Sequence, residues 1–98
     1  WSQWWTFKDI FSKFYDSAAL YKKPMMITEF GSLVVGGNRA RWYTDALGSL
    51  PAHFPLVRSV VFFHFSKDNT TTQQTLNWYL KNDKAVTTAI VKEVGKWK

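Results

Sequence analysis

Cysteine is absent from this chain of 98 residues, and histidine occurs only as His53 and His64. The absence of cysteine excludes disulfides and thiolate metal sites, although it does not decide the cellular compartment of the protein. No glycine-rich loop has the spacing that cradles phosphate groups. Because the sequence carries neither a metal-binding nor a nucleotide-binding signature, we expect the chain to need no cofactor.

Long apolar runs are also missing. No segment approaches the roughly 20 residues that a membrane-spanning helix requires, and the N-terminus lacks the basic-then-apolar layout of a signal peptide. We therefore expect no membrane partner. The chain starts at Trp1 without a methionine, so we interpret residues 1–98 as one domain-sized piece of a longer protein.

The charge is mainly of one sign, since 13 Lys and Arg against 7 Asp and Glu give a formal net charge of +6. These cations are scattered from Lys8 to Lys98, and their longest run is Lys22-Lys23. Because this pattern forms no basic patch, we expect no nucleic-acid partner. Aromatic residues make up 18% of the chain, a surplus that usually serves a core, a protein partner or the face of a sugar ring.

The order of predicted elements is helix, strand, helix, strand, helix. The first helix covers residues 7 to about 21, with Thr6 as N-cap and Pro24 beyond its end. One face of this helix carries apolar side chains that we expect to pack in the core: Phe7, Ile10, Phe11, Phe14 and Ala18. The strand over 25–29 that follows does not alternate apolar with polar residues, which fits a strand covered on both faces.

The second half of the chain repeats the helix-then-strand unit. Asn38 is a suitable N-cap for a second helix that Pro51 and Pro55 close. We expect its buried face to consist of Trp42, Tyr43, Ala46, Leu47 and Leu50. β-Branched and aromatic residues predict a strand over 57–65, and residues 71–81 are interpreted as an irregular loop. Asn82 or Asp83 can cap a last helix, which has on one face Val86, Ala89, Ile90, Val94 and Trp97.

This alternation predicts an α/β fold with two parallel strands joined by right-handed crossovers. Two parallel strands alone leave both sheet edges open and lack an opposing layer. The sequence therefore predicts a unit that is incomplete as an isolated chain and needs further strands from elsewhere.

The stretch from Pro24 to Ser32 is an apolar run that delivers one carboxylate, Glu29, and then breaks at Gly31. A strand that ends on a glutamate is how a barrel enzyme presents an acid at the mouth of its active site. The alternative interpretation is that Glu29 merely meets solvent at the end of a buried strand.

Several segments, taken with their spacing, resemble the C-terminal part of a retaining endoglycanase of glycoside hydrolase family 26, which has a (β/α)8, or TIM, barrel. Trp4-Trp5-Thr6-Phe7-Lys8-Asp9-Ile10-Phe11 resembles the family's tryptophan loop and sixth helix. Lys23-Pro24-Met25-Met26-Ile27-Thr28-Glu29-Phe30-Gly31-Ser32 resembles its seventh strand. Residues 57–68 resemble the eighth strand and its loop, Trp78 the tryptophan that follows, and residues 83–96 the closing helix. The resemblance covers nearly all of this chain but only the last quarter or third of the barrel.

The resemblance implies that Glu29 is the catalytic nucleophile, which attacks the anomeric carbon and forms a covalent glycosyl-enzyme. That mechanism needs a second carboxylic acid about 5 to 5.5 Å away. The family supplies it from strand four, which this chain lacks. We expect Glu93, the only other glutamate, to have a surface role, and Asp68 to form a turn. The chain alone is therefore expected to be inactive.

Five further residues are expected to bind substrate. Phe62 stands where the family usually has a tryptophan beneath the sugar, and His64 stands where asparagine is common. His64 would hydrogen-bond a sugar hydroxyl, hold Glu29, or satisfy only a neighbouring backbone group. Trp4, Trp5 and Trp78 are candidates for the walls of a glycan cleft, with core packing as the alternative role.

The sequence thus predicts the C-terminal part of a retaining β-glycan endo-hydrolase that contributes the nucleophile and part of the sugar cleft. Its expected partners are a β-glycan polysaccharide or oligosaccharide and the remainder of the barrel. The family resemblance alone favours an extracellular or periplasmic location. The alternative is a non-catalytic α/β module that binds glycan through its tryptophans or an acidic protein through its positive charge.

Overall fold

The computed structural model describes residues 4–33, 36–65 and 77–97. Its elements are α1 (Phe7–Ala19), β1 (Met25–Phe30), α2 (Arg39–His53), β2 (Val57–Phe62) and α3 (Lys84–Val94). The two strands pair in parallel and form one sheet. This confirms the predicted element order and the coarse expectation of a small α/β unit with parallel strands. Within the described residues, no helix is long and apolar enough to span a membrane.

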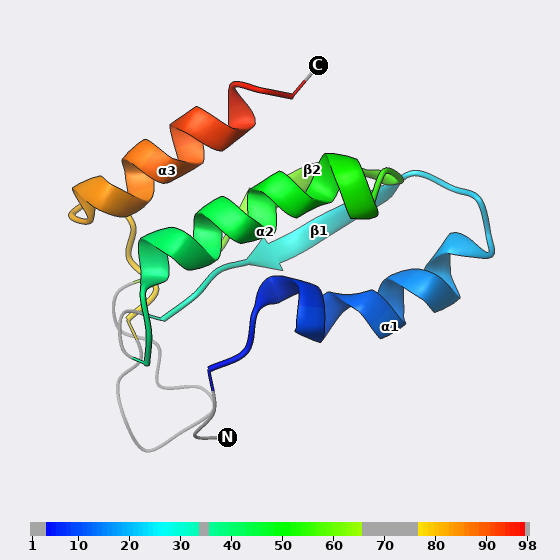
Figure 1. Cartoon of the computed structure of the whole chain (residues 1–98), viewed down its shortest axis with the longest axis horizontal. Coiled ribbons are helices and arrows are strands. Elements are labelled where there is room, and N and C mark those ends of the chain that lie inside the picture. Colours follow the sequence, from blue (N-terminus) through cyan, green and yellow to red (C-terminus); the bar gives the residue numbers. More distant parts are fainter. Residues whose placement is uncertain (1–3, 34–35, 66–76, 98) are drawn as a thin grey trace.

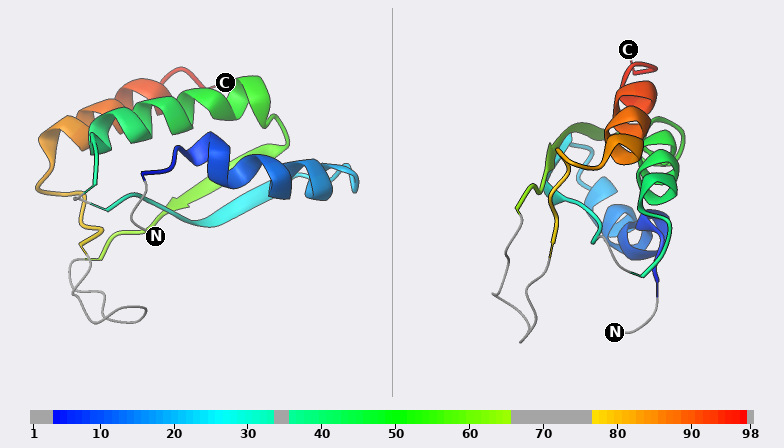
Figure 2. Two further views of the ribbon diagram at one scale, coloured as in Figure 1. Left: turned by 60° about the horizontal axis from the view of Figure 1, so that its bottom comes forward. Right: turned by 90° about the vertical axis from the view of Figure 1, so that its left-hand side faces the viewer.

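The molecule has two layers, a layer of helices and the sheet. Figure 1 shows α2 between α1 and α3, with the strands behind it, and Figure 2 shows that all three helices lie on the same side of the sheet. The crossover from β1 to β2 therefore places α2 on the same side of the sheet as α1 and α3. Among the described residues, no helix covers the other side of the sheet.

The core lies between the two layers and centres on α2. Tyr43, Leu47 and Leu50 are almost fully buried there, as is Val86 of α3. The ring of Phe7 at the start of α1 lies 5.0 Å from the ring of Phe30 at the end of β1 and completes this core towards the strand ends. The predicted core face of α2 is thereby confirmed.

The two faces of the sheet differ in exposure. Met25 and Ile27 of β1 pack against the core, whereas Met26 is 59% exposed. In β2 the same contrast holds between Val60, which packs against the core, and Val61, which is 49% exposed. The expectation that the first strand is covered on both faces is therefore wrong for the isolated chain, because its three helices cover one face only.

The predicted N-caps of the helices are confirmed. The side chains of Thr6, Asn38 and Asp83 accept hydrogen bonds from backbone N–H groups in the first turns of α1, α2 and α3. The predicted closure of α2 by Pro51 and Pro55 is correct in part, because the helix continues through Pro51 and ends at His53, two residues before Pro55. A proline in the last turn removes only its own hydrogen bond, and the Phe54 N–H still donates to the Leu50 carbonyl at 3.0 Å.

The expected burial of the α1 stripe is only partly correct. Phe7 is buried and Phe11 packs against the core, but Ile10 is 61% and Phe14 63% exposed. The reason is that α1 has a helical neighbour on one side only, so its outer flank is uncovered. Tyr15 is buried instead, and its hydroxyl accepts a hydrogen bond from the Leu56 N–H at 3.1 Å.

Strand β2 ends at Phe62, earlier than the predicted 57–65. Just beyond it, the Phe63 N–H still donates to the Phe30 carbonyl at 2.9 Å, and the Phe65 carbonyl then accepts from the Trp78 N–H at 2.7 Å. Residues 77–83 form no helix or strand, as predicted, whereas Asp68 and residues 71–76 lie outside the described residues. In α3, Val86 is fully buried and Ile90 packs against the core, but Val94 is 37% exposed, so the predicted packing face of this helix is only partly correct.

Candidate active site

Glu29 lies next to a β-bulge in β1. Ile27 pairs with Val60 and Phe30 pairs with Phe62, so β1 places one more residue than β2 between these two pairs. In a regular strand, Glu29 would follow Met25 and Ile27 onto the helical side. The bulge shifts the alternation, so that Phe30 is 2% exposed in the core and Glu29 is exposed. The local backbone thus directs this carboxylate out of the core at the carboxyl end of the strand.

Trp78 lies beside the segment that carries Glu29. A Cβ atom placed on Gly31 would lie 3.4 Å from Cε3 of the indole. The same ring packs edge-on against Phe63, with centroids 5.4 Å apart. Trp78 is half-buried and therefore spans the carboxyl ends of both strands. Of the three tryptophans predicted as cleft walls, Trp78 lies against Gly31, directly after β1.

His64 makes a backbone contact. Its Nδ1 accepts a hydrogen bond from the Leu80 N–H at 3.0 Å, and its ring stacks on Tyr79 with centroids 4.2 Å apart. Within the described residues no hydrogen bond joins His64 to Glu29. Because Nδ1 is an acceptor, the neutral imidazole carries its proton on Nε2. Of the roles considered for His64, the one seen in the structure is satisfying a neighbouring backbone group.

Phe62 lies on the helical side of the sheet. Its ring is 5.6 Å from that of Phe30 and 6.2 Å from that of Tyr43, and it packs against the core. These contacts favour a packing role over stacking beneath a sugar. A ligand contact for Phe62 stays a prediction.

The two tryptophans before α1 are placed differently from Trp78. Trp4 is half-buried and its indole covers Gly37, where an added Cβ would lie 2.5 Å from two ring atoms. Trp5 is 49% exposed, and its carbonyl accepts a hydrogen bond from Nε1 of Trp42 at 2.9 Å. In the structure described, neither ring contacts Glu29, so their role as cleft walls stays a prediction.

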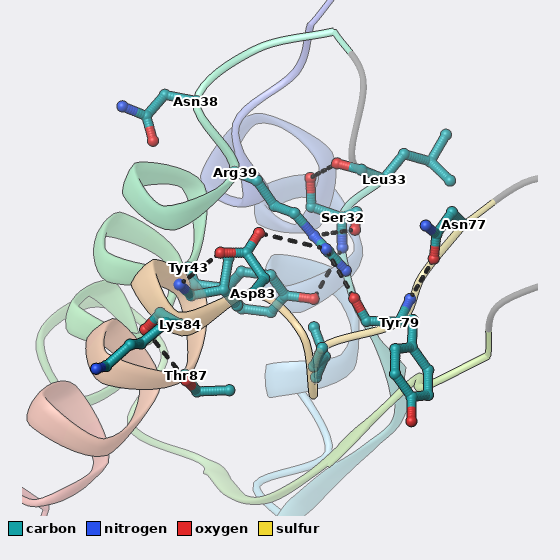
Figure 3. Close-up of polar contacts among 12 residues, drawn as sticks. Ser32, Leu33, Asn38, Arg39, Tyr43, Asn77, Tyr79, Asp83, Lys84 and Thr87 are labelled. Atoms are coloured by element: carbon teal, nitrogen blue, oxygen red, sulfur yellow. Dashed lines mark hydrogen bonds and ion pairs between the residues drawn. The ribbon is translucent and has the colours of Figure 1, made fainter.

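A buried polar network lies behind these strand ends and was not found from the sequence (Figure 3). Nε of Arg39 donates to the Ser32 carbonyl at 3.0 Å, and Nη1 donates to the Tyr79 carbonyl at 2.8 Å. Nη1 also lies 3.6 Å from the carboxylate of Asp83. The hydroxyl of Tyr43 accepts from the Ser32 N–H at 3.2 Å. We call these five residues the Arg39 network. No local pattern identifies it, because its members come from three separate parts of the chain.

The environment of Tyr43 disfavours ionisation. Burial raises the pKa of the phenol above its ordinary value of 10.0, and this effect exceeds the opposing effects of the Ser32 N–H and the nearby Arg39 charge. Tyr43 therefore stays neutral and serves the network as a hydroxyl.

Glu93 is buried, which corrects its expected surface role. It is 7% exposed, and its Oε2 accepts from Nζ of Lys96 at 3.0 Å. The carboxylate lies against Gly48 of α2, where an added Cβ would be 3.1 Å from Oε1. The close packing of α3 on α2 encloses this side chain. Because Glu93 faces α2 and not the strand ends, it offers no second carboxylate to Glu29.

The site as described contains one exposed carboxylate at the end of β1, with Trp78 against Gly31 and the Arg39 network at Ser32 in the loop that follows. Among the described residues, no three His, Asp or Glu side chains gather where they could hold a metal ion. One carboxylate can act as a nucleophile, but glycosidic bond cleavage by the retaining route requires an acid as well.

Comparison with known proteins adds one relative. No protein-family model matches the chain. Over 67 residues, or 68% of this chain, it is 42% identical to endoglucanase H of Acetivibrio thermocellus. The matched region amounts to 7% of endoglucanase H, so the chain corresponds to a small part of that protein. The similarity supports the coarse expectation of a glycoside hydrolase-like segment.

Proposed function

We propose that this chain supplies strands seven and eight, with their flanking helices, to the (β/α)8 barrel of a retaining β-glycan endo-hydrolase similar to glycoside hydrolase family 26. In this proposal, Glu29 is the nucleophile. The similarity to a segment of a protein named endoglucanase H supports a glycan substrate.

The observation that carries the proposal is the bulge at Glu29. Without it, strand alternation would direct the carboxylate towards the buried core, where an unpaired charge is strongly disfavoured. With it, Glu29 is exposed at the carboxyl end of a parallel strand. Bulges often occur next to active sites because they re-aim one side chain.

The exposure of the sheet supports the barrel. In a (β/α)8 barrel the outer face of every strand meets helices, and the inner face meets side chains from the other strands. Here the helix-side residues pack in a core, while Met26 and Val61 on the other face are 59% and 49% exposed. Further strands would cover these two side chains in a closed barrel.

The chemistry assigned to Glu29 is nucleophilic displacement. The carboxylate attacks the anomeric carbon, the glycosidic carbon–oxygen bond breaks, and a covalent glycosyl-enzyme forms that water later hydrolyses with retained configuration. The leaving oxygen takes its proton from an acid that belongs to the remainder of the barrel. The chain therefore contributes part of the sugar cleft but does not cleave a glycan on its own.

A hybrid protein tests this assignment. The whole 98-residue chain replaces the corresponding segment of endoglucanase H, and hydrolysis of a panel of soluble β-glycans is measured with and without Glu29→Gln. We expect the hybrid to hydrolyse at least one glycan and Glu29→Gln to lower kcat by about 10³-fold or more, as loss of a nucleophile does. The isolated chain should show no hydrolysis.

Asp16→Asn provides the matched control, since it also removes one negative charge from an exposed side chain, in α1. It should leave kcat within about twofold, because exposed sites away from the chemistry are tolerant. Hydrolysis by the hybrid that does not depend on Glu29, or hydrolysis by the 98-residue chain alone, contradicts the proposal. Glycan binding without any Glu29-dependent hydrolysis would favour the non-catalytic module.

A further inference from the structure

One guanidinium joins two distant segments at the carboxyl ends of the strands. Arg39 is the first residue of α2 and is 5% exposed. It donates to the Ser32 carbonyl through Nε at 3.0 Å and to the Tyr79 carbonyl through Nη1 at 2.8 Å. Because the donors of a guanidinium are fixed in one plane, their geometry sets the separation of these two carbonyls.

Both segments carry candidate site residues. Ser32 lies in the loop that directly follows the strand end bearing Glu29. Tyr79 adjoins Trp78 and stacks on the ring of His64. Figure 3 shows the guanidinium reaching between the Ser32 and Tyr79 backbones. A shift of either backbone would therefore change the position of Glu29 relative to the aromatic segment.

Ser32 and Asp83 anchor the two ends of this connection. The N–H of Ser32 donates to the hydroxyl of Tyr43 at 3.2 Å, so both polar backbone groups of Ser32 are held by side chains of α2. Asp83 caps α3 through Oδ1, which accepts from the Val86 N–H, and presents Oδ2 to the guanidinium. The position of the network is thus tied to the start of both α2 and α3.

We infer that Arg39 is a positioning residue, which fixes the strand end bearing Glu29 against the segment bearing Trp78. The catalytic consequence of this inference rests on the proposed function, whereas the geometric part does not. A buried charge adds little net stability compared with an apolar side chain of similar volume. Stability alone therefore does not account for a guanidinium at this site. Holding the Ser32 and Tyr79 carbonyls at a fixed separation does.

The geometric part is tested by NMR on the 98-residue chain, using Arg39→Met and Arg39→Lys. The measurements are hydrogen exchange at the Ser32 amide and the chemical shift of the Trp78 indole N–H. We expect Arg39→Met to accelerate exchange at Ser32 by about tenfold or more and to shift the indole signal. Arg39→Lys should give intermediate effects, because lysine keeps the charge near Asp83 but cannot hold two carbonyls in one plane.

Arg41→Met is the matched control. Arg41 lies in the same turn of α2, but its side chain is 79% exposed, and its ion pair among the described residues is with Asp45, at 3.6 Å. The control should change neither signal. Unchanged Ser32 exchange and an unchanged Trp78 shift in Arg39→Met, with the amides of α2 still protected, would overturn the inference. If Arg39→Met unfolds the chain, unchanged signals in Arg39→Lys would overturn it.

Activity in the hybrid protein separates this inference from the proposed function. Arg39→Lys should lower kcat by about 10- to 100-fold with KM changed by less than about threefold, since displacement of a reacting group by about 1 Å has that effect. If Glu29→Gln leaves hydrolysis intact, the proposed function fails while the NMR result still decides the geometric role. If Glu29→Gln abolishes hydrolysis and Arg39→Lys does not lower kcat, the positioning role is wrong and the proposed function stands.

Discussion

The indole of Trp4 lies directly on Gly37, in the segment that leads from β1 to α2. A Cβ atom at position 37 would be 2.5 Å from Cδ2 and Cε2 of that ring, a distance at which one of the two groups must move. Gly36 beside it has a φ of +115°, a conformation that L side chains rarely adopt. These two glycines therefore bring the start of the chain against the segment that follows β1.

Gly37→Ala should displace Trp4. We expect a loss of about 1 to 3 kcal/mol in the free energy of unfolding, the usual cost of overpacking. In a Trp4→Ala background the same substitution should cost less than about 0.5 kcal/mol, because nothing then occupies the space. Urea unfolding of the four proteins in this double-mutant cycle measures the difference. Equal costs in both backgrounds would show that Trp4 does not lie on Gly37.

The pKa of Tyr43 predicts a dependence of stability on pH. Burial raises this pKa above 10.0, so between the ordinary and the raised value the unfolded chain loses a proton that the folded chain keeps. The contribution of Tyr43 is fully present below about pH 10 and is lost as pH rises through the raised pKa. Stability of the wild-type chain should therefore fall above pH 10.

Tyr43→Phe removes this titration and also the acceptor for the Ser32 N–H. The variant should be less stable than wild type by about 1 kcal/mol at pH 7, the usual net value of one hydrogen bond. Between pH 10 and 11 the difference in free energy of unfolding between wild type and variant should narrow, because only the wild type loses stability through ionisation of this phenol. Urea unfolding of both proteins at pH 7 to 11 measures this difference. A difference that stays constant or widens above pH 10 would contradict a raised pKa for Tyr43.

The two faces of β1 should respond differently to truncation. Ile27→Ala, on the helical side, should lower the free energy of unfolding by about 2 kcal/mol, whereas Met26→Ala should change it by less than about 0.5 kcal/mol, since Met26 is 59% exposed. Thermal or urea unfolding of the 98-residue chain measures both. Comparable losses would mean that the second face is also covered in solution.

Met26→Lys extends that comparison to the closed barrel. In the isolated chain the lysine should be tolerated, because the side chain reaches water. In the hybrid protein it should be destabilising by about 2 kcal/mol or more, because the barrel interior would bury an unpaired charge. Tolerance in both proteins would contradict the placement of this face inside a barrel.

Much of the fold was predictable because its signals are local. The N-caps Thr6 and Asn38 act within one helical turn, and the buried face of α2 follows helical periodicity. The exposure of Phe14 and Met26 was not predictable in the same way. Their apolar character indicates burial, but the helices and strands of the described residues leave both side chains exposed.

In the candidate site, too, the features with a local signal were predictable and those that depend on contacts between distant segments were not. Glu29 was identified from a strand that ends in a carboxylate before a glycine, but its exposure depends on a bulge that only pairing with β2 reveals. No sequence pattern indicates that Arg39 is buried and hydrogen-bonded, because its partners Ser32 and Tyr79 come from other segments of the chain. The expected surface role of Glu93 is wrong because α3 approaches α2 closely at Gly48, and no local pattern around Glu93 indicates that contact.

Covalent trapping is the most direct test of the assignment of Glu29. The hybrid protein is treated with a 2-deoxy-2-fluoro β-glycoside that carries a good leaving group, so that the glycosyl-enzyme forms faster than water releases it. Mass spectrometry of the digested protein then locates the sugar. The account predicts a sugar ester on Glu29, absent from Glu29→Gln. Stoichiometric labelling of another residue, or hydrolysis with inverted configuration and no label, would contradict it.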